Sequence, residues 1–240
     1  MRYRKLYIVF IAMALVVVVS GCGAPGGTAE QNHIAYKSQI TAVQEAVNDY
    51  KKDTGVLPIK NSTETTPIYK KYRIDFKRLV PQYMDEAPSN AYESGGVYQY
   101  VLVDAEKHPQ VKVFDLSLDN QVEDIQSKIQ VYRASHHFSP LGGIIRDGVY
   151  KIDFKQLGYK KPPTVTSPYS GHPLGFIMDK SSKVYIDYLP DVRQAVKKSG
   201  KSYPADVDLR ALLIDQSQYV PVDSLPYVMN DGQVVYQIAQ

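Results

Sequence analysis

Two apolar stripes of identical spacing constrain the fold of this chain more than any other feature. Each stripe advances in steps of four and three residues, which places its members on one face of an α-helix. The first consists of Tyr36, Ile40, Val43, Val47 and Tyr50, and the second of Leu118, Val122, Ile125, Ile129 and Tyr132. A shorter third stripe consists of Leu189, Val192 and Val196. A proline follows each stripe at the same distance, so the sequence predicts three helices that end in equivalent ways.

The similarity continues beyond each predicted helix. Residues 72–79 match residues 150–157 at six of eight positions, and residues 205–212 form a looser third copy. Each copy carries an aspartate ahead of a short apolar turn, at Asp75, Asp153 and Asp208. Three recurring carboxylates would suit acid/base chemistry, but an Asp in this position is typical of a helix N-cap, whose carboxylate accepts a bond from a backbone N–H. We predict that these aspartates are structural.

Strand-like runs follow each copy, after a glycine at Gly95, Gly171 or Gly232. The runs are Val97–Val103 with Val111–Leu116, Leu174–Met178 with Lys183–Tyr188, and Val234–Ala239. The sequence therefore predicts an α+β fold with antiparallel sheet. We interpret it as three related modules of helix, short helical turn and β-hairpin at residues 34–117, 118–188 and 189–240. The third module is truncated, and the three form one continuous globular unit.

The N-terminal segment has the order of a secretory signal. Arg2, Arg4 and Lys5 precede residues 6–19, which carry no charge, and the small residues Ser20 and Gly21 follow. The apolar run is short for a membrane span, which needs about 20 residues. We therefore expect residues 1–21 to be a cleaved signal peptide.

Val19-Ser20-Gly21-Cys22 resembles the lipobox of bacterial lipoproteins. The resemblance implies a diacylglyceryl group on the Cys22 sulfur, cleavage between Gly21 and Cys22, and a second acyl chain, such as palmitate, on the new amino group. An uncleaved anchor or a plain signal peptide with an incidental cysteine are the alternatives, but the single Cys of the chain lies where the lipobox requires it. We expect residues 22–33 to be a flexible tether at the extracytoplasmic face of the cell membrane.

Processing changes the charge of the protein. The precursor has 28 Lys and Arg, 25 Asp and Glu and a pI of about 8.7, but removal of residues 1–21 takes three cations and no anions. The mature chain is formally neutral, so its charge gives no support for a nucleic-acid partner.

Two further resemblances concern the soluble part. Residues 50–58, in which a helix end is followed by Gly55 and Pro58, resemble the soluble domains of type IV pilins and pseudopilins. Over its full length the chain resembles an uncharacterised lipoprotein family of Gram-positive spore formers such as Bacillus, sometimes labelled as periplasmic-binding proteins of ABC transporters. The segments that carry this resemblance are residues 50–58, Asp75-Phe76 and residues 90–98.

Motifs for catalysis are absent from the sequence: there is no His-Glu-x-x-His pair, no Gly-x-Ser-x-Gly elbow and no calcium loop. His108, His136, His137 and His172 lack a metal-ligand spacing, so we predict no metal and no cofactor. A basic cluster consists of Lys70, Lys71, Arg73, Lys77 and Arg78, and we interpret it as a solvated face.

These observations favour a non-enzymatic binding or scaffolding lipoprotein that uses its repeated modules to bind an envelope protein or a cell-wall partner. The alternative is a solute-binding lipoprotein of an ABC uptake transporter. Such receptors usually have two α/β lobes with parallel sheets, whereas the hairpin pattern predicts antiparallel ones.

Overall fold

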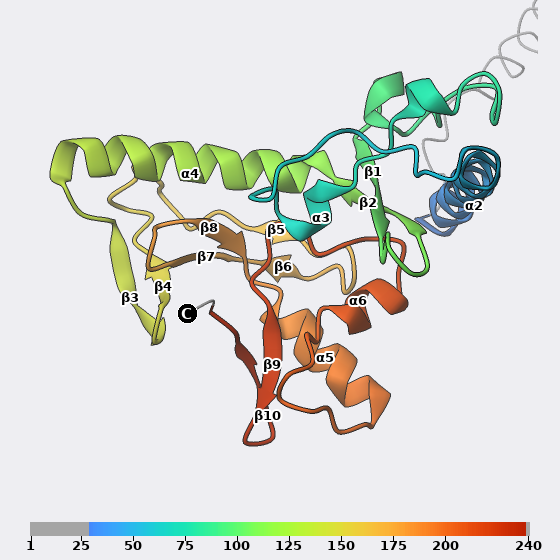
Figure 1. Ribbon diagram of the computed structural model, residues 1–240. Helices are drawn as coiled ribbons and strands as arrows, with labels where there is room; N and C mark the ends of the chain where they lie inside the picture. Colours follow the sequence, from blue (N-terminus) through green and yellow to red (C-terminus); the bar gives the residue numbers. More distant parts are fainter. Residues whose placement is uncertain (1–28, 239–240) are drawn as a thin grey trace, which may run out of the picture. The chain divides into compact units, whose positions relative to one another are not determined.

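The computed structural model describes residues 29–238 of the chain, and side chains from residue 36 onward (Figure 1). The predicted signal peptide, its cleavage site at Gly21 and Cys22, and residues 22–28 of the predicted tether lie outside the described residues. Helix α2 (Ala29–Thr54) begins inside that tether, because residues 29–33 are helical. Residues 39–240 form one unit, whose described part is discussed below.

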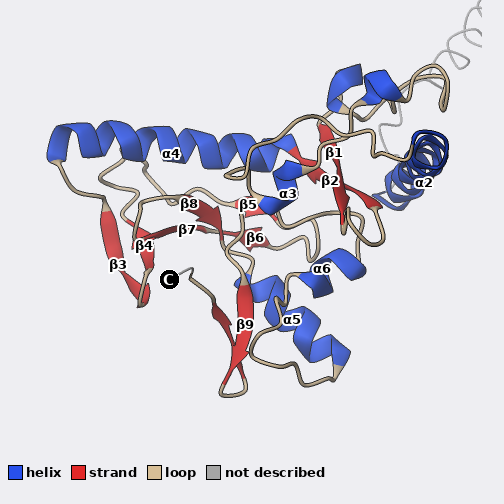
Figure 2. Cartoon of the chain, in the orientation of Figure 1, coloured by secondary structure: helices blue, strands red, loops and turns tan. Residues whose placement is uncertain are grey.

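The elements of this unit are helices and short antiparallel strands, coloured by type in Figure 2, so the predicted α+β class is confirmed. The helices after α2 are α3 (Ile68–Lys71), α4 (Leu116–His136), α5 (Leu189–Ser199) and α6 (Ala211–Asp215). The first strands are β1 (Tyr98–Val103), β2 (Gln110–Asp115), β3 (Leu141–Arg146), β4 (Val149–Ile152) and β5 (Val165–Thr166). The later strands are β6 (Pro173–Leu174), β7 (Phe176–Asp179), β8 (Val184–Ile186), β9 (Tyr227–Asn230) and β10 (Gln233–Tyr236).

The first apolar stripe packs α2 against the hairpin β1–β2. Val43 and Val47 are fully buried, in one hydrophobic cluster with Tyr100 and Leu102 of β1 and with Val113 of β2. Burying side chains of this size stabilises the fold by about 1.5–3 kcal/mol each, relative to leaving them exposed. The stripe read from the sequence is thus the face that forms this core.

The second stripe packs α4 on a larger sheet. Four strands pair antiparallel in the order β3-β4-β7-β8, and α4 contacts β8. Ile125 and Ile129 of the helix are buried in a second cluster with Val149, Met178 and Ile186 of the sheet. A helix with an apolar face and a sheet with an apolar face therefore cover each other.

The hairpin β3–β4 was not predicted. Residues 149–152 form a strand ahead of Asp153, and the turn that this aspartate caps follows it, as predicted. The signal was Asp147-Gly148 between the apolar pairs Ile144-Ile145 and Val149-Tyr150, a common hairpin turn sequence.

The third segment differs from its predicted pattern at its hairpin. Gly95 and Gly171 precede strands β1 and β7, as expected, but Gly232 lies in the turn between β9 and β10, together with Asp231. Both turn residues have positive φ (48° and 75°), which a tight two-residue hairpin turn of this kind requires. Gly232 therefore precedes a strand, as predicted, but β9 on the other side of the turn was not predicted.

The three aspartates cap short turns, as predicted. The carboxylate of Asp75 accepts a bond from the backbone N–H of Lys77 at 3.3 Å, and that of Asp153 from Lys155 at 3.1 Å. Asp208 accepts the N–H of Arg210 at 3.0 Å. The division into three related modules stays a prediction. In the described residues the core consists of two clusters. One is formed by residues 40–113, and the second and third segments share the other with Val101 and Phe114 of the first.

Within residues 29–238, no helix combines the length and the apolar character that crossing a bilayer requires.

Candidate functional site

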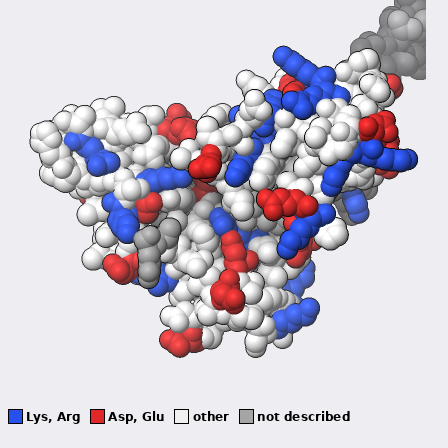
Figure 3. Space-filling model, viewed as in Figure 1, with Lys and Arg blue, Asp and Glu red and all other residues white. Residues whose placement is uncertain are grey.

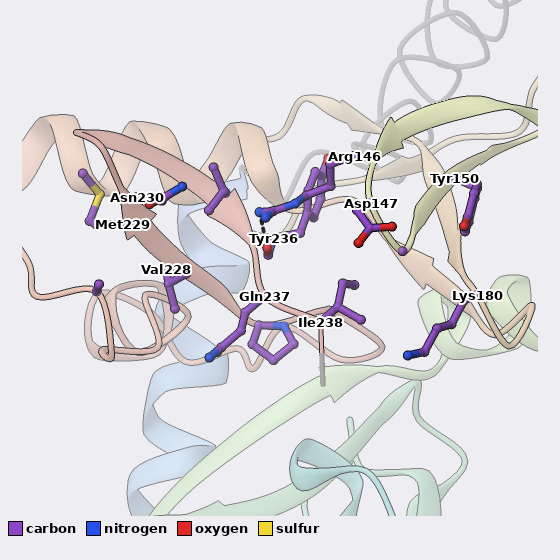
Figure 4. Close-up of a pocket in the computed structure, with 14 residues that line it drawn as sticks. Arg146, Asp147, Tyr150, Lys180, Val228, Met229, Asn230, Tyr236, Gln237 and Ile238 are labelled. Carbon is purple, nitrogen blue, oxygen red and sulfur yellow. Dashed lines mark hydrogen bonds between the residues drawn. The ribbon is translucent and has the colours of Figure 1, made fainter. Parts of the chain in front are cut away.

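A cleft of about 900 Å³ lies between the hairpins β3–β4 and β9–β10 (Figure 4). Its lining comes from the β3–β4 turn, β4, Lys180 in the β7–β8 turn, Ala205, and residues 226–238 around the last hairpin. Figure 4 shows Asp147, Tyr150 and Lys180 on one side and Val228 and Asn230 on the other. The volume is within the range of pockets that bind small ligands, about 300–1,000 Å³.

Two contacts join the hairpins at the cleft. The Arg146 guanidinium donates a hydrogen bond to the backbone carbonyl of Tyr236 in β10. Gly148 has a φ of 76°, and a Cβ at this position would lie 3.3 Å from the side chain of Ile238. Glycine thus provides both the turn conformation and the close approach of the C-terminal segment.

Tyr236 fixes β10 to the start of α5. Its hydroxyl is 3.0 Å from each carboxylate oxygen of Asp187, which also accepts the N–H of Leu189 at 3.1 Å. Burial raises the pKa of Asp187, and these two hydrogen bonds oppose the rise. Burial also raises the pKa of Tyr236, and the neighbouring Asp187 charge adds to that increase. The cleft therefore has one rigid wall.

The lining of the cleft combines charged and apolar side chains. Arg146 and Lys180 provide two cations against the single carboxylate of Asp147, while Val228, Met229 and other apolar residues line the opposite wall. This combination suits an apolar group that carries an acidic end. Elsewhere on the face shown in Figure 3, cationic and anionic side chains are interspersed.

A buried ionic cluster lies apart from the cleft. Lys70 of α3 forms ion pairs with Asp119 of α4 and, at 2.8 Å, with Asp223 in the loop between α6 and β9. Only 5% of the Asp223 side chain is exposed, and its Oδ2 atom has no hydrogen-bond partner among the described residues. The cluster joins the N-terminal segment to the rest of the unit.

Burial and charge compete in this cluster. Burial raises the pKa of Asp223 to about 6, although the positive charge of Lys70 acts in the opposite direction. Burial alone would lower the pKa of Lys70, but the combined influence of Asp223 and Asp119 raises it. The backbone carbonyl of Asp223 accepts the N–H of Ile186, and Asp223 has a φ of 51°.

The cluster also corrects the interpretation of the basic residues. Arg73, Lys77 and Arg78 are exposed, as a solvated face requires, but Lys70 is enclosed between carboxylates. Its partners lie in segments remote in the sequence, so the basic run gave no indication of the ion pairs.

His108, His136, His137 and His172 have exposed side chains. His136 ends α4 and stacks on Tyr132 with ring centroids 4.0 Å apart, and His137 is the C-cap with a φ of 64°. His108 and His172 lie in other loops, and residues 29–238 bring together no group of three or more His, Cys, Asp or Glu side chains suited to a metal.

Sequence reasoning missed the cleft altogether. Four separate segments contribute its lining, and none of them carries a motif. The Asp147-Gly148 hairpin signal would have located one wall.

The described residues form a small-sheet α+β protein with a surface cleft. Residues 36–115 match the YphF family N-terminal domain, an uncharacterised family. The matched segment runs from α2 to the end of β2 and includes the whole N-terminal hydrophobic cluster. Comparison with curated proteins and with solved structures gives no match.

Proposed function

We propose that this chain is a lipid-anchored lipoprotein of the extracytoplasmic membrane face that binds an envelope partner without catalysing a reaction. The anchor is the lipid on Cys22. Support for it comes from the sequence, where a basic start, an uncharged run and a small-residue cleavage site precede the single cysteine.

The cleft between β3–β4 and β9–β10 carries the binding part of the proposal. Its two cations and its apolar wall suit a segment of a partner protein or cell-wall peptide that presents an apolar side chain and a carboxylate. The contacts of Arg146 and Tyr236 hold the walls together, and such preorganisation favours binding because less conformational entropy is lost.

The anchor is tested by Cys22→Ser in the full chain, expressed in a Gram-positive host. We expect the variant to lose the acyl mass on the N-terminal peptide and to leave the membrane fraction. Ser20→Ala is the matched control, since it exchanges one small residue for another and is expected to be processed normally. Unchanged processing and retention of Cys22→Ser would refute the anchor.

Binding at the cleft is tested by placing a photoreactive residue at Gln237 in membrane-bound protein. We expect a discrete crosslink to one envelope component, which Lys180→Glu abolishes through charge repulsion. Lys161→Glu makes the same charge change at an exposed position outside the cleft and is expected to keep the crosslink. A crosslink that both variants keep would show that the cleft is not the site.

A solute-binding lipoprotein of an ABC transporter is the second candidate, because the cleft volume also suits a small ligand. The named sheets in the described residues are all antiparallel, which differs from the usual parallel lobes of such receptors. A small solute that raises the melting temperature of the wild type and of Lys161→Glu, but not of Lys180→Glu, would favour this candidate.

A further inference from the structure

The two edges of the four-stranded sheet differ in how they are covered. At the β8 edge, the N–H of Val184 donates to the side chain of Gln126 at 2.8 Å, and the N–H of Ile186 donates to the carbonyl of Asp223 at 2.8 Å. At the other edge, β3 pairs with β4 on one side, and no strand of the described chain lies on its other side (Figure 1).

The uncovered strand and the segment before it are apolar. Phe138, Leu141 and Ile144 are 58%, 50% and 74% exposed. All four residues from Leu141 to Ile144 are exposed. Soluble proteins usually protect a free edge with charges, proline, β-bulges or a covering segment. β3 has two register shifts against β4, between Leu141 and Gly143 and between Ile144 and Arg146. In β3, no charge occurs before Arg146, the last residue of the strand.

Two glycines, Gly142 and Gly143, lie within β3. A Cβ at Gly142 would lie 3.0 Å from the carbonyl oxygen of Ile152, so this glycine permits close pairing with β4. Gly143 has a φ of 133°, and a Cβ there would meet nothing within 4 Å. The described residues therefore leave the face of the strand uncovered at Gly143.

We propose that a second copy of this chain adds its own β3 to this edge in antiparallel orientation, which joins the two sheets into one. The inference goes beyond the proposed binding at the cleft and does not require it. Strand addition of this kind satisfies the backbone N–H and C=O groups of both edges.

The charge pattern favours an identical strand as the occupant. Residues 138–145 carry no charge, so two copies in antiparallel pairing bring no like charges together. The nearest cation on the neighbouring strand is Lys151, opposite Gly143, and in the pair the two Lys151 residues would be three strand spacings apart, about 14 Å. That distance exceeds the Debye length of about 8 Å at physiological salt.

The apolar area argues for a weak dimer. Three side chains that are half to three-quarters exposed offer on the order of a few hundred Å², which is the size of patches that mark interaction sites. It is below the roughly 800 Å² per partner of standard stable interfaces. We therefore expect reversible association at micromolar or higher concentration.

The test is sedimentation velocity of the full-length protein in mild detergent over a hundredfold concentration range. We expect the weight-average mass to shift from monomer to dimer, and Ile144→Lys to remain monomeric because its ammonium would be buried in the pair. Val56→Lys is the matched control, as Val56 is also exposed (53%) but lies after α2, and it should dimerise like the wild type.

Hydrogen exchange identifies the surface independently of any substitution. The backbone amides of β3 that do not pair with β4 should exchange several-fold more slowly at the high concentration than at the low one. A monomer at every concentration, or a dimer whose β3 amides exchange at unchanged rates, would overturn the proposal. Either result leaves the anchor and cleft experiments unaffected.

Discussion

Gln44 and Gln126 make the same pair of hydrogen bonds in two different helices. Gln44 of α2 accepts the backbone N–H of Val111 at 2.7 Å and donates to the carbonyl of Pro109 at 3.1 Å. Gln126 of α4 accepts the N–H of Val184 at 2.8 Å and donates to the carbonyl of Ser182 at 3.0 Å. Each glutamine follows the third residue of its apolar stripe, and each closes its helix onto the second strand of a hairpin.

The third helix has Arg193 at the corresponding position, directly after Val192. An arginine has donors only, and its Nη2 lies 3.5 Å from the carbonyl of Val234 in β10. The helix-to-hairpin link is thus present in three places, although its chemistry differs in the last. These bonds support the proposal that the three segments are related.

We predict that Gln126→Leu destabilises the protein by about 2 kcal/mol, since it leaves one N–H and one carbonyl of the β7–β8 hairpin without their partner. Urea unfolding measures this change. Gln130→Leu, one turn further along α4 at an exposed position, should change the free energy of unfolding by less than about 0.5 kcal/mol. Equal losses in the two variants would contradict the assigned role.

The capping aspartates should differ in their contributions. Asp75→Ala removes a cap and an ion pair with Arg78, whose side chain is 44% exposed, and should cost about 1 kcal/mol because exposed ion pairs contribute little. Asp208→Ala removes a cap and also an ion pair, in which the Arg210 Nη2 atom lies 2.6 Å from the carboxylate. The Arg210 side chain is only 9% exposed. An unpaired buried guanidinium is costly, so we expect a loss of about 2 kcal/mol or more from Asp208→Ala. Thermal or urea unfolding of both variants tests which one loses more free energy of unfolding. A larger loss in Asp75→Ala than in Asp208→Ala would contradict the prediction.

Asp223 should make stability depend on pH. Its pKa is about 6 in the folded protein and 3.8 for an unperturbed Asp, so the folded state binds a proton more tightly. The stability that this proton provides is present below pH 4 and is lost as the pH rises through about 6. We expect the free energy of unfolding of the wild type, relative to Asp223→Asn, to fall by on the order of 2 kcal/mol between pH 4 and 7.

Asn suits the left-handed backbone at position 223, so this variant isolates the charge. Asp85→Asn, the same substitution at an exposed position, is the control. A pH-independent difference for Asp223→Asn would show that its carboxyl is ionised throughout this range.

Tyr236→Phe should loosen the last hairpin. The change removes the hydroxyl that donates to the buried carboxylate of Asp187, which should cost about 2 kcal/mol. The pKa of Asp187 should rise further, because a hydrogen bond that lowers it is lost. Tyr92→Phe serves as the control, as Tyr92 is 60% exposed. Urea unfolding measures the loss. The pH dependence of the difference in free energy of unfolding between the two variants tests the change in the pKa of Asp187.

The sequence by itself determined part of the local structure of this protein, namely three helices, four strands and the caps. The stripes gave the three helices because an apolar face of period 3.6 has no other stable use, and alternation gave β1, β2, β7 and β8. The caps at Asp75, Asp153 and Asp208 were readable for the same reason, since each bond lies within two residues of the aspartate.

Only the tertiary structure decided the sites. Lys70 looked like part of a solvated basic run until Asp119 and Asp223 enclosed it from distant segments. The cleft exists because the β3–β4 turn lies close to β10, and no local sequence pattern predicts that contact. Local hydrogen bonds and periodicity depend on residues close together in the sequence. Burial, pKa shifts and clefts depend on which remote segments come together.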